Sequence, residues 1–256
     1  MSILAHGEDP NFGPFSKTIK KGVGFIIKSQ RSTGMIGSSM YSHAFATLCL
    51  AETYGTLYDK RIGPALEKAV KLLLSSQEKN PTGAWRYSPS ARDADTTAAG
   101  ACMVALFAAR NAGIGIPRKS VEKCLAYYKR CQSPDGGFGY TGPGSSDVPR
   151  SAIGTLVYAL ARKKNSPVFK RALNYIKGRG YQTDGYHYYT LYYMPQALFQ
   201  SDIVHWRHWN QLNIKFLKAR QSKAGSWNGS NGAAFSTAAG LLSLALNYRL
   251  LPIYER

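Results

Sequence analysis

The chain has 256 residues, of which 33 are Lys or Arg and 14 are Asp or Glu, so its formal net charge is +19. Hydrophobic residues make up 44% and charged residues 18%, a globular composition that excludes disorder along the whole chain. The longest mainly apolar stretch, residues 98–109, is shorter than the roughly 20 residues that span a bilayer, so no transmembrane helix is predicted. Four cysteines are too few for a disulfide scaffold. Composition therefore predicts a soluble, strongly basic protein with a sizeable core.

The first residues read as the end of a helix. Residues 3–5 are followed by His6 and Gly7, and a glycine commonly follows the last helical residue. Residues 1–9 contain neither the basic nor the apolar segment of a signal peptide. We expect the natural chain to begin earlier and residues 1–13 to be a truncated helix remnant, with a short natural arm as the alternative. Cellular localisation is then left open, because an export signal or membrane anchor would belong to the preceding segment.

Two kinds of helical segment alternate along the chain. The first kind has an apolar stripe and a basic opposite face, which predicts amphipathic helices. In chain order these segments are 14–29, 62–76, 117–131, 167–177 and 205–220. The second kind is rich in Ala, Gly, Ser and Thr and apolar on nearly every side, which predicts buried helices. These segments are 42–54, 96–111, 151–162, 188–199 and 236–248. The sequence thus predicts five hairpins of an outer and an inner helix, and an all-α fold.

A short motif recurs after the outer helices: a Gln, then Gly four positions later, then a large apolar residue two further on. It is complete after Gln30, Gln132 and Gln221, is two residues longer after Gln77, and is one residue shorter after Gln182. A motif that recurs in this way is the signature of a repeat architecture, so it constrains the fold. The last inner helix is as apolar as the others, whereas an open solenoid needs a polar final face, so the pattern favours closure of the array into a ring.

This motif resembles the prenyltransferase/squalene oxidase repeat that squalene–hopene cyclases, oxidosqualene cyclases and protein prenyltransferase β-subunits share. The likeness covers residues 14–248. It implies a terpenoid cyclase-like (α/α) toroid of about five to six helical hairpins, with two concentric helix rings around a cavity, and one domain over residues 14–256. In that family the repeat Gln and aromatic residue tie the end of an outer helix to its neighbour. The resemblance gives this structural role to Gln77, Trp85, Gln132, Phe138, Gln221 and Trp227.

The segment from Arg92 to Ala98 resembles the D-x-D-D-T-A motif of class II terpene cyclases, whose middle Asp protonates the substrate. The resemblance places this acid at Asp95, with Asp93 in support; the sequence departs from the motif at Thr96, where the family has Asp. Crowded carboxylates raise one pKa, as such an acid requires. The alternative is that Asp95 only caps the following helix, where N–H donors would lower its pKa, while Asp93 pairs with Arg92 or Arg86.

Aromatic and histidine side chains provide further candidates for a cavity wall. Three tyrosines share a helix face, where their rings would stabilise a carbocation in a cavity or pack as core against a neighbouring helix. Each histidine is either a cavity residue or a hydrogen-bonded histidine at a helix start. The candidate ligand-binding residues are His43, His187, Tyr188, Tyr189, Tyr192 and Tyr193.

Neither a metal nor a cofactor is expected. The cysteines lie inside helical patterns without the spacing of metal ligands, and the chain contains no phosphate-binding or dinucleotide-binding motif. The positive charge lies mainly on the outer helices, either as a solvated rim or as a face for an anionic membrane surface or an acidic protein. Nucleic acid is not expected as a partner, because the aromatic residues belong to the helix stripes.

Together these patterns predict a terpene-cyclase-like protein that binds an isoprenoid-type apolar ligand in a central cavity. Its activity would be protonation-initiated cyclisation, which makes it an isomerase or lyase if it is an enzyme. The alternative is a non-catalytic toroid that acts as a ligand-binding or protein-interaction scaffold with a basic outer face. A full cyclase of this kind usually pairs two such domains, so the sequence leaves the enzyme assignment open.

Overall fold

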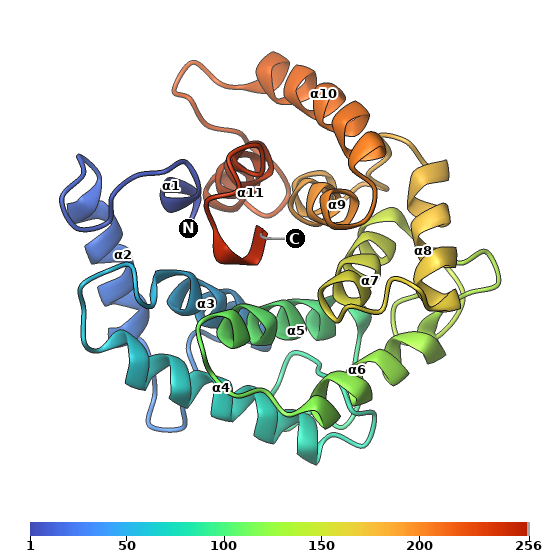
Figure 1. The fold of residues 1–256 in the computed structure, drawn as a ribbon, viewed down its shortest axis with the longest axis horizontal. Coiled ribbons are helices and arrows are strands. Elements are labelled where there is room, and N and C mark those ends of the chain that lie inside the picture. The colour runs from blue at the N-terminus through green and yellow to red at the C-terminus, as the bar shows by residue number, and fades with distance from the viewer. Residues whose placement is uncertain (255–256) are drawn as a thin grey trace. The chain divides into compact units, whose positions relative to one another are not determined.

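The computed structural model describes residues 1–254, and these residues fold into eleven α-helices and one short 3-10 helix (Figure 1). No β-strand occurs within them; Phe138 forms isolated bridges with Gln132 and Asp147. No helix of this part of the chain is long and apolar enough to cross a membrane. The predicted all-α class is confirmed.

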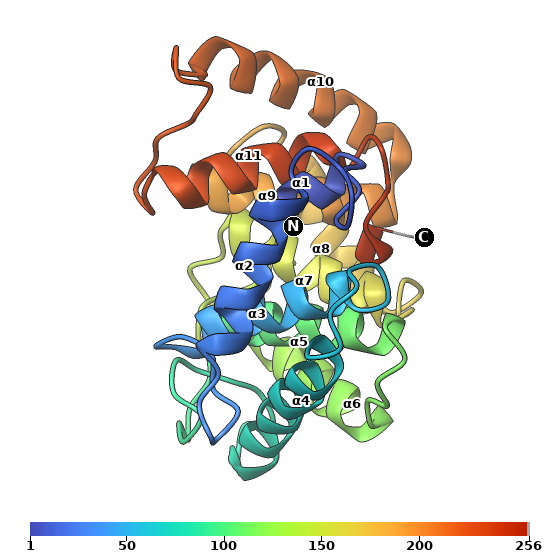
Figure 2. The same ribbon diagram turned by 90° about the vertical axis from the view of Figure 1, so that its left-hand side faces the viewer.

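The chain divides into two compact units, one of residues 3–129 with a segment that starts at Leu251, and one of residues 130–250. The assignment of residues 14–256 to one domain stays a prediction. The helices of the first unit are α1 (Ser2–Ala5), α2 (Ser16–Lys28), α3 (Met40–Thr53), α4 (Ile62–Lys79), α5 (Thr96–Asn111), most of α6 (Arg118–Cys131) and the 3-10 helix η1 (Pro252–Tyr254). The buried α3 and α5 pack against each other, and α4 contacts both (Figures 1 and 2).

The second unit is built around α9. Its helices are α7 (Val148–Leu160), α8 (Pro167–Gly178), α9 (His187–Ser201), α10 (Ile203–Arg220) and α11 (Ala233–Ala245). Helix α9 packs against both α7 and α11, while α8 contacts α7 and α10 contacts α9 and α11 (Figures 1 and 2). The alternation of amphipathic and buried helices is therefore present in both units.

The predicted inner helices are all found within a few residues of their expected bounds, and residues 96–111 coincide with α5. Helix α3 begins earlier than predicted because Ser39 is its cap: the Ser39 side chain accepts a hydrogen bond from the Ser42 N–H. Helix α7 also begins earlier, because Asp147 caps it by accepting from the Arg150 N–H. Pro149 fits in its first turn, where a missing N–H leaves no intrahelical bond unmade.

In the amphipathic segment 14–29, the sequence pattern predicts an apolar stripe that includes Phe15, Ile19 and Val23, and the structure differs at the first of these. Ile19 and Val23 of α2 are buried, but Phe15 is 47% exposed. The reason is that α2 begins at Ser16, so Phe15 occupies the flanking position, whose non-helical backbone does not continue the stripe. Lys17 and Lys20 of the same helix are exposed. Their part in binding a membrane surface or an acidic protein stays a prediction.

The repeat glutamines join their own loop to the next amphipathic helix. The Nε2 group of Gln77 donates to the carbonyl of Gly83 at 2.8 Å and to that of Ser120, in α6, at 2.9 Å. The same pair of bonds joins Gln30 to Gly34 and Ala65, and Gln132 to Gly136 and Val168. Gln132 and Gln221 directly follow the last residues of α6 and α10, as predicted.

The repeat glycine is required by its backbone and by close packing. Gly136 has φ +94°, in the left-handed region, and a Cβ there would lie 2.8 Å from the Arg171 carbonyl oxygen. Gly34 has φ +95°, and its Cβ would lie 2.8 Å from the Lys68 carbonyl oxygen. The loop can therefore approach the neighbouring helix only where the side chain is missing.

The repeat aromatic residues are buried: Trp85 is 1%, Phe138 0% and Trp227 3% exposed. The Trp227 indole N–H donates to the Leu217 carbonyl at 2.8 Å, and Trp85 makes the equivalent bond to Leu73 at 2.9 Å. Each indole thus donates to the backbone carbonyl of the residue four positions before the repeat glutamine.

Candidate functional site

Asp95 lies at the N-terminus of α5 and is fully buried. Its Oδ1 accepts hydrogen bonds from the N–H groups of Thr97 at 2.9 Å and Ala98 at 2.7 Å, and from the Thr97 hydroxyl at 2.5 Å. This is the geometry of a helix cap, in which a short acidic side chain satisfies the free N–H groups of the first turn. One oxygen of the carboxyl is thus fully engaged.

The second oxygen, Oδ2, is buried and accepts no hydrogen bond. Its charged neighbour is Arg86, whose Nε lies 3.4 Å away. Arg86 also pairs with Asp93 through its other end, at 2.7 Å. The side chain of Asp93 is 69% exposed, whereas that of Asp95 is not exposed at all. One guanidinium therefore links a solvated carboxylate to a buried one.

Burial raises the pKa of Asp95 above its ordinary value. The hydrogen bonds from Thr97 and Ala98 and the charge of Arg86 act in the opposite direction, because they favour the charged form, but burial outweighs them. The sequence predicts a raised pKa and cap geometry as alternatives for Asp95. This prediction is wrong, since the same carboxyl shows both.

Tyrosines from distant parts of the first unit fix the segment around Asp95. The Tyr41 hydroxyl donates to the Thr97 hydroxyl, which in turn donates to Asp95. The hydroxyl of Tyr127 donates to the Ala94 carbonyl at 2.7 Å, and Tyr128 donates to the Thr96 carbonyl. Sequence reasoning missed these three tyrosines, because their contacts join residues 32 to 56 positions apart and no local pattern announces them.

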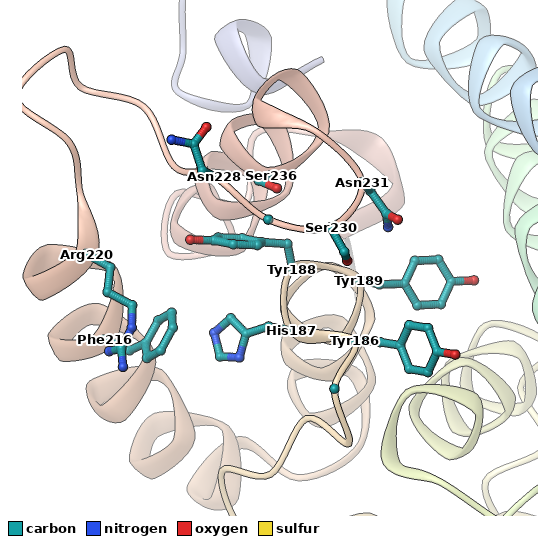
Figure 3. A pocket seen from close by; sticks show the side chains of 12 residues that line it. Tyr186, His187, Tyr188, Tyr189, Phe216, Arg220, Asn228, Ser230, Asn231 and Ser236 are labelled. Carbon is teal, nitrogen blue, oxygen red and sulfur yellow. The ribbon is translucent and has the colours of Figure 1, made fainter.

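A pocket of about 270 Å³ lies in the second unit, at the start of α9 (Figure 3). Tyr188 and Tyr189 of α9 line it, together with Phe216 and Arg220 of α10. Gly185, Tyr186 and His187 also line it. The remaining wall comes from the loop that precedes α11 and from α11 itself. The lining residues there are Asn228, Gly229, Ser230, Asn231 and Ser236.

The predicted aromatic group divides between this pocket and the core. His187, Tyr188 and Tyr189 line the pocket. Tyr192 and Tyr193 lie further along α9 and are 4% and 0% exposed, with their ring centroids 4.6 Å apart. The structure therefore brings the first three together at the pocket and packs the other two inside the unit.

His43 is fully buried in the first unit. Its Nδ1 accepts from the Ile36 N–H at 3.2 Å, so Nε2 carries the proton and donates to the Ala69 carbonyl at 3.1 Å. Burial lowers its pKa, which favours this neutral form. Both nitrogens are satisfied by the backbone, as in the hydrogen-bonded alternative stated for this residue.

His187 differs from His43 because one ring nitrogen is left over. Its Nδ1 lies 3.2 Å from the Thr183 hydroxyl, but Nε2 is buried and has no hydrogen bond. The ring centroid lies 3.9 Å from that of Phe216. Burial lowers the pKa of His187 to about 4, and the charge of Arg220 acts in the same direction.

No group of three or more His, Cys, Asp or Glu residues that could hold a metal ion occurs in residues 1–254. The cysteines of this part of the chain are free thiols. The chemistry available at the two locations is therefore that of carboxyl, hydroxyl, imidazole and guanidinium groups.

Comparison with solved structures identifies similar folds. A variant of the type II terpene cyclase MstE from Scytonema, in complex with geranylgeranyl dihydroxybenzoate as substrate, has TM-score 0.62 at 20% identity, over 91% of this chain and 72% of that chain. A second MstE variant, in complex with merosterolic acid A as product, has TM-score 0.61 at 19% identity, over 91% and 73%. A protein from Actinoplanes has TM-score 0.65 at 17% identity, over 90% and 74%.

No protein-family model matches the chain, and a search of curated proteins finds no match. The structural likeness shows the fold: this chain has the fold of type II terpene cyclases, the (α/α) toroid class. The resemblance that the repeat suggested is thus confirmed for the fold. Because fold alone does not establish an activity, the function is argued from the site.

Proposed function

We propose that the protein is a terpene-cyclase-like isomerase that binds an isoprenoid-type apolar ligand and starts its cyclisation by proton transfer from Asp95. The observation that carries this proposal is the state of the Asp95 carboxyl, which is fully buried, has a raised pKa and has one oxygen without a hydrogen bond. It occurs on a fold shared with MstE, whose substrate is an isoprenoid conjugate.

The geometry assigns different tasks to the two carboxyl oxygens. Oδ1 already accepts three hydrogen bonds from Thr97 and Ala98, so the acidic proton resides on Oδ2. Transfer of that proton to an alkene carbon forms a C–H bond and leaves a carbocation on the adjacent carbon. A second alkene attacks the cation and closes a ring. The final cation loses a proton to water, which gives a product with the mass of the substrate, and water returns a proton to the Asp95 carboxylate.

Arg86 supports this step through its two ion pairs. Its charge stabilises the Asp95 carboxylate that remains after proton transfer, as electrostatic stabilisation of a developing charge requires. The closer pair with Asp93, at 2.7 Å, holds the guanidinium in place. Burial dominates the pKa of Asp95, although the charge of Arg86 lowers it. Asp93 thereby acts as a positioning residue, because it holds Arg86. This role is consistent with the sequence, in which Thr96 stands where the family motif has a further Asp.

The test is turnover of geranylgeranyl dihydroxybenzoate by the full chain, with mass spectrometry and chromatography to detect an isomer of unchanged mass. We expect Asp95→Asn to abolish turnover and leave stability nearly unchanged, because Asn caps a helix about as well as Asp. Asp147→Asn is the matched control: Asp147 also caps a buried helix, and burial also raises its pKa.

Turnover that survives Asp95→Asn, or that is lost equally in Asp147→Asn, contradicts the assignment of Asp95. The non-catalytic alternative makes a different prediction. If the wild-type chain binds the probe in a calorimetric titration and yields no isomer, the protein is a ligand-binding scaffold rather than a cyclase.

A further inference from the structure

The pocket in the second unit lies where two helices begin. Tyr186 precedes α9 and Gly232 precedes α11; neither end is capped by a side chain, and neither first turn contains an acidic residue. Residues from both starts line the same pocket, as Figure 3 shows for Tyr188 and Ser236. A helix N-terminus presents free N–H groups and the positive end of the helix dipole. The start of α9, whose first three residues line the pocket, thus favours negative charge there.

The residues that line this pocket include an arginine and no Asp or Glu. Arg220 lines it, with its guanidinium carbon 4.0 Å from the centroid of the Phe216 ring. Residues 203–250, which supply Arg220 and the α11 side of the pocket, contain six Lys or Arg residues and no Asp or Glu. Asp184, the acidic residue next to the lining residue Gly185, accepts a hydrogen bond from the Val148 N–H at 2.8 Å.

Two buried polar atoms of the pocket have no hydrogen bond. Ser236 is fully buried, and its hydroxyl has no partner; the same holds for Nε2 of His187. A buried hydroxyl without a partner is costly, so in a pocket it is available to bond to a ligand. Gly229 lies beside Ser236, since a Cβ there would come 2.7 Å from the Ser236 oxygen. The loop backbone therefore passes close to this hydroxyl only because residue 229 has no side chain.

We propose that this pocket binds a small oxyanion, a phosphate or a carboxylate, either free or as the headgroup of a longer molecule. Arg220 supplies the positive charge, the start of α9 supplies N–H groups, and Ser236 and His187 supply hydrogen bonds. The volume of about 270 Å³ is below the roughly 300–1,000 Å³ of pockets for whole drug-sized ligands, which suits a headgroup. The site does not depend on Asp95 or on the proposed cyclase activity.

The test is isothermal titration of the full chain with inorganic phosphate and, separately, with benzoate, at low ionic strength. We expect saturable binding of one anion per chain for at least one of them. Phosphate alone identifies a phosphate site, and benzoate alone a carboxylate site. Arg220→Gln should weaken binding about tenfold or more, because a charge-assisted bond is lost, and Ser236→Ala several-fold.

Arg207→Gln is the matched control, since Arg207 is exposed on the same helix, is absent from the pocket lining and gives the same change in charge. Its binding should stay within about twofold of the wild type. As a second readout, the imidazole NMR signals of His187 should shift on titration in the wild type and not in Arg220→Gln. Absence of binding by both anions, or equal weakening by Arg207→Gln and Arg220→Gln, overturns the proposal.

Discussion

Gln77 and Ser120, which are 43 residues apart in sequence, exchange two hydrogen bonds: the Gln77 amide donates to the Ser120 carbonyl, and the Ser120 hydroxyl donates to the Gln77 side-chain oxygen. Both residues are buried, at 2% and 7% exposure. Gln77 also holds the Gly83 carbonyl of its own loop. One side chain therefore joins α4, α6 and the loop between α4 and α5.

Removal of this side chain should destabilise the protein. Gln77→Ala leaves the Ser120 and Gly83 groups without their partner in a buried place, which should cost about 1–3 kcal/mol of unfolding free energy. The matched control is Gln221→Ala, because Gln221 is exposed and its amide bonds to the Gly225 carbonyl. Its cost should be under about 1 kcal/mol. Equal losses for the two variants in a urea titration would contradict the role given to Gln77.

The repeat glycine should resist substitution. Gly136→Ala forces a side chain into a left-handed backbone conformation and against the Arg171 carbonyl, so we expect a loss of about 1–3 kcal/mol. Gly142→Ala is the control, since a Cβ there meets nothing within 4 Å. Thermal unfolding followed by circular dichroism measures both. A Gly136→Ala melting temperature equal to that of Gly142→Ala would show that the loop yields without cost.

Truncation of the last repeat aromatic residue tests the core of the second unit. Trp227→Ala removes a side chain that is only 3% exposed, and the cavity should cost about 3–5 kcal/mol. Trp227→Phe keeps most of the apolar bulk but loses the hydrogen bond to the Leu217 carbonyl, so its cost should be lower. A loss below about 1 kcal/mol for Trp227→Ala in a denaturant titration would mean that the indole is not part of the core.

His187 should make stability depend on pH. Its pKa is about 4 in the folded chain against 6.5 ordinarily, so the unfolded chain binds a proton more readily between these values. Its contribution to stability is therefore present above pH 6.5 and is lost as the pH falls from about 6.5 to about 4. Urea titrations at pH 7 and pH 4.5 should show a smaller difference for His187→Gln than for the wild type. An identical difference would place the titration elsewhere.

The helices could be predicted from the sequence because the patterns that define them are local. The helix from Thr96 to Asn111 was predicted with the correct bounds, because Asp95 is a strong cap and the helix that follows is apolar on nearly every side. The start of α7 was missed because Asp147 caps it ahead of Pro149, within a segment that reads as a loop. Periodicity alone does not show which of several polar residues caps a helix, so it cannot locate such a helix start.

The candidate site was predictable only in part. The motif indicated Asp95 and Asp93, and Arg86 was one of two arginines considered for Asp93. The hydrogen bond from Tyr41 joins residues 56 positions apart, so it follows from packing and not from a local signal. Of the pocket in the second unit, His187, Tyr188 and Tyr189 were among the predicted ligand-binding residues, whereas Arg220 and Ser236 were missed. A signal for a basic pocket existed, because residues 203–250 contain six basic and no acidic side chains.

The ties made by the repeat glutamines run in one direction along the chain. Gln30, Gln77 and Gln132 each find one acceptor in their own loop and a second in a helix encoded later, at Ala65, Ser120 and Val168. During synthesis each tie therefore stays half-made until the following helix has left the ribosome, and domains generally consolidate from the N-terminus as the chain emerges. In a nascent chain of this protein, each of these glutamines would thus complete its second hydrogen bond only after the following amphipathic helix has been synthesised.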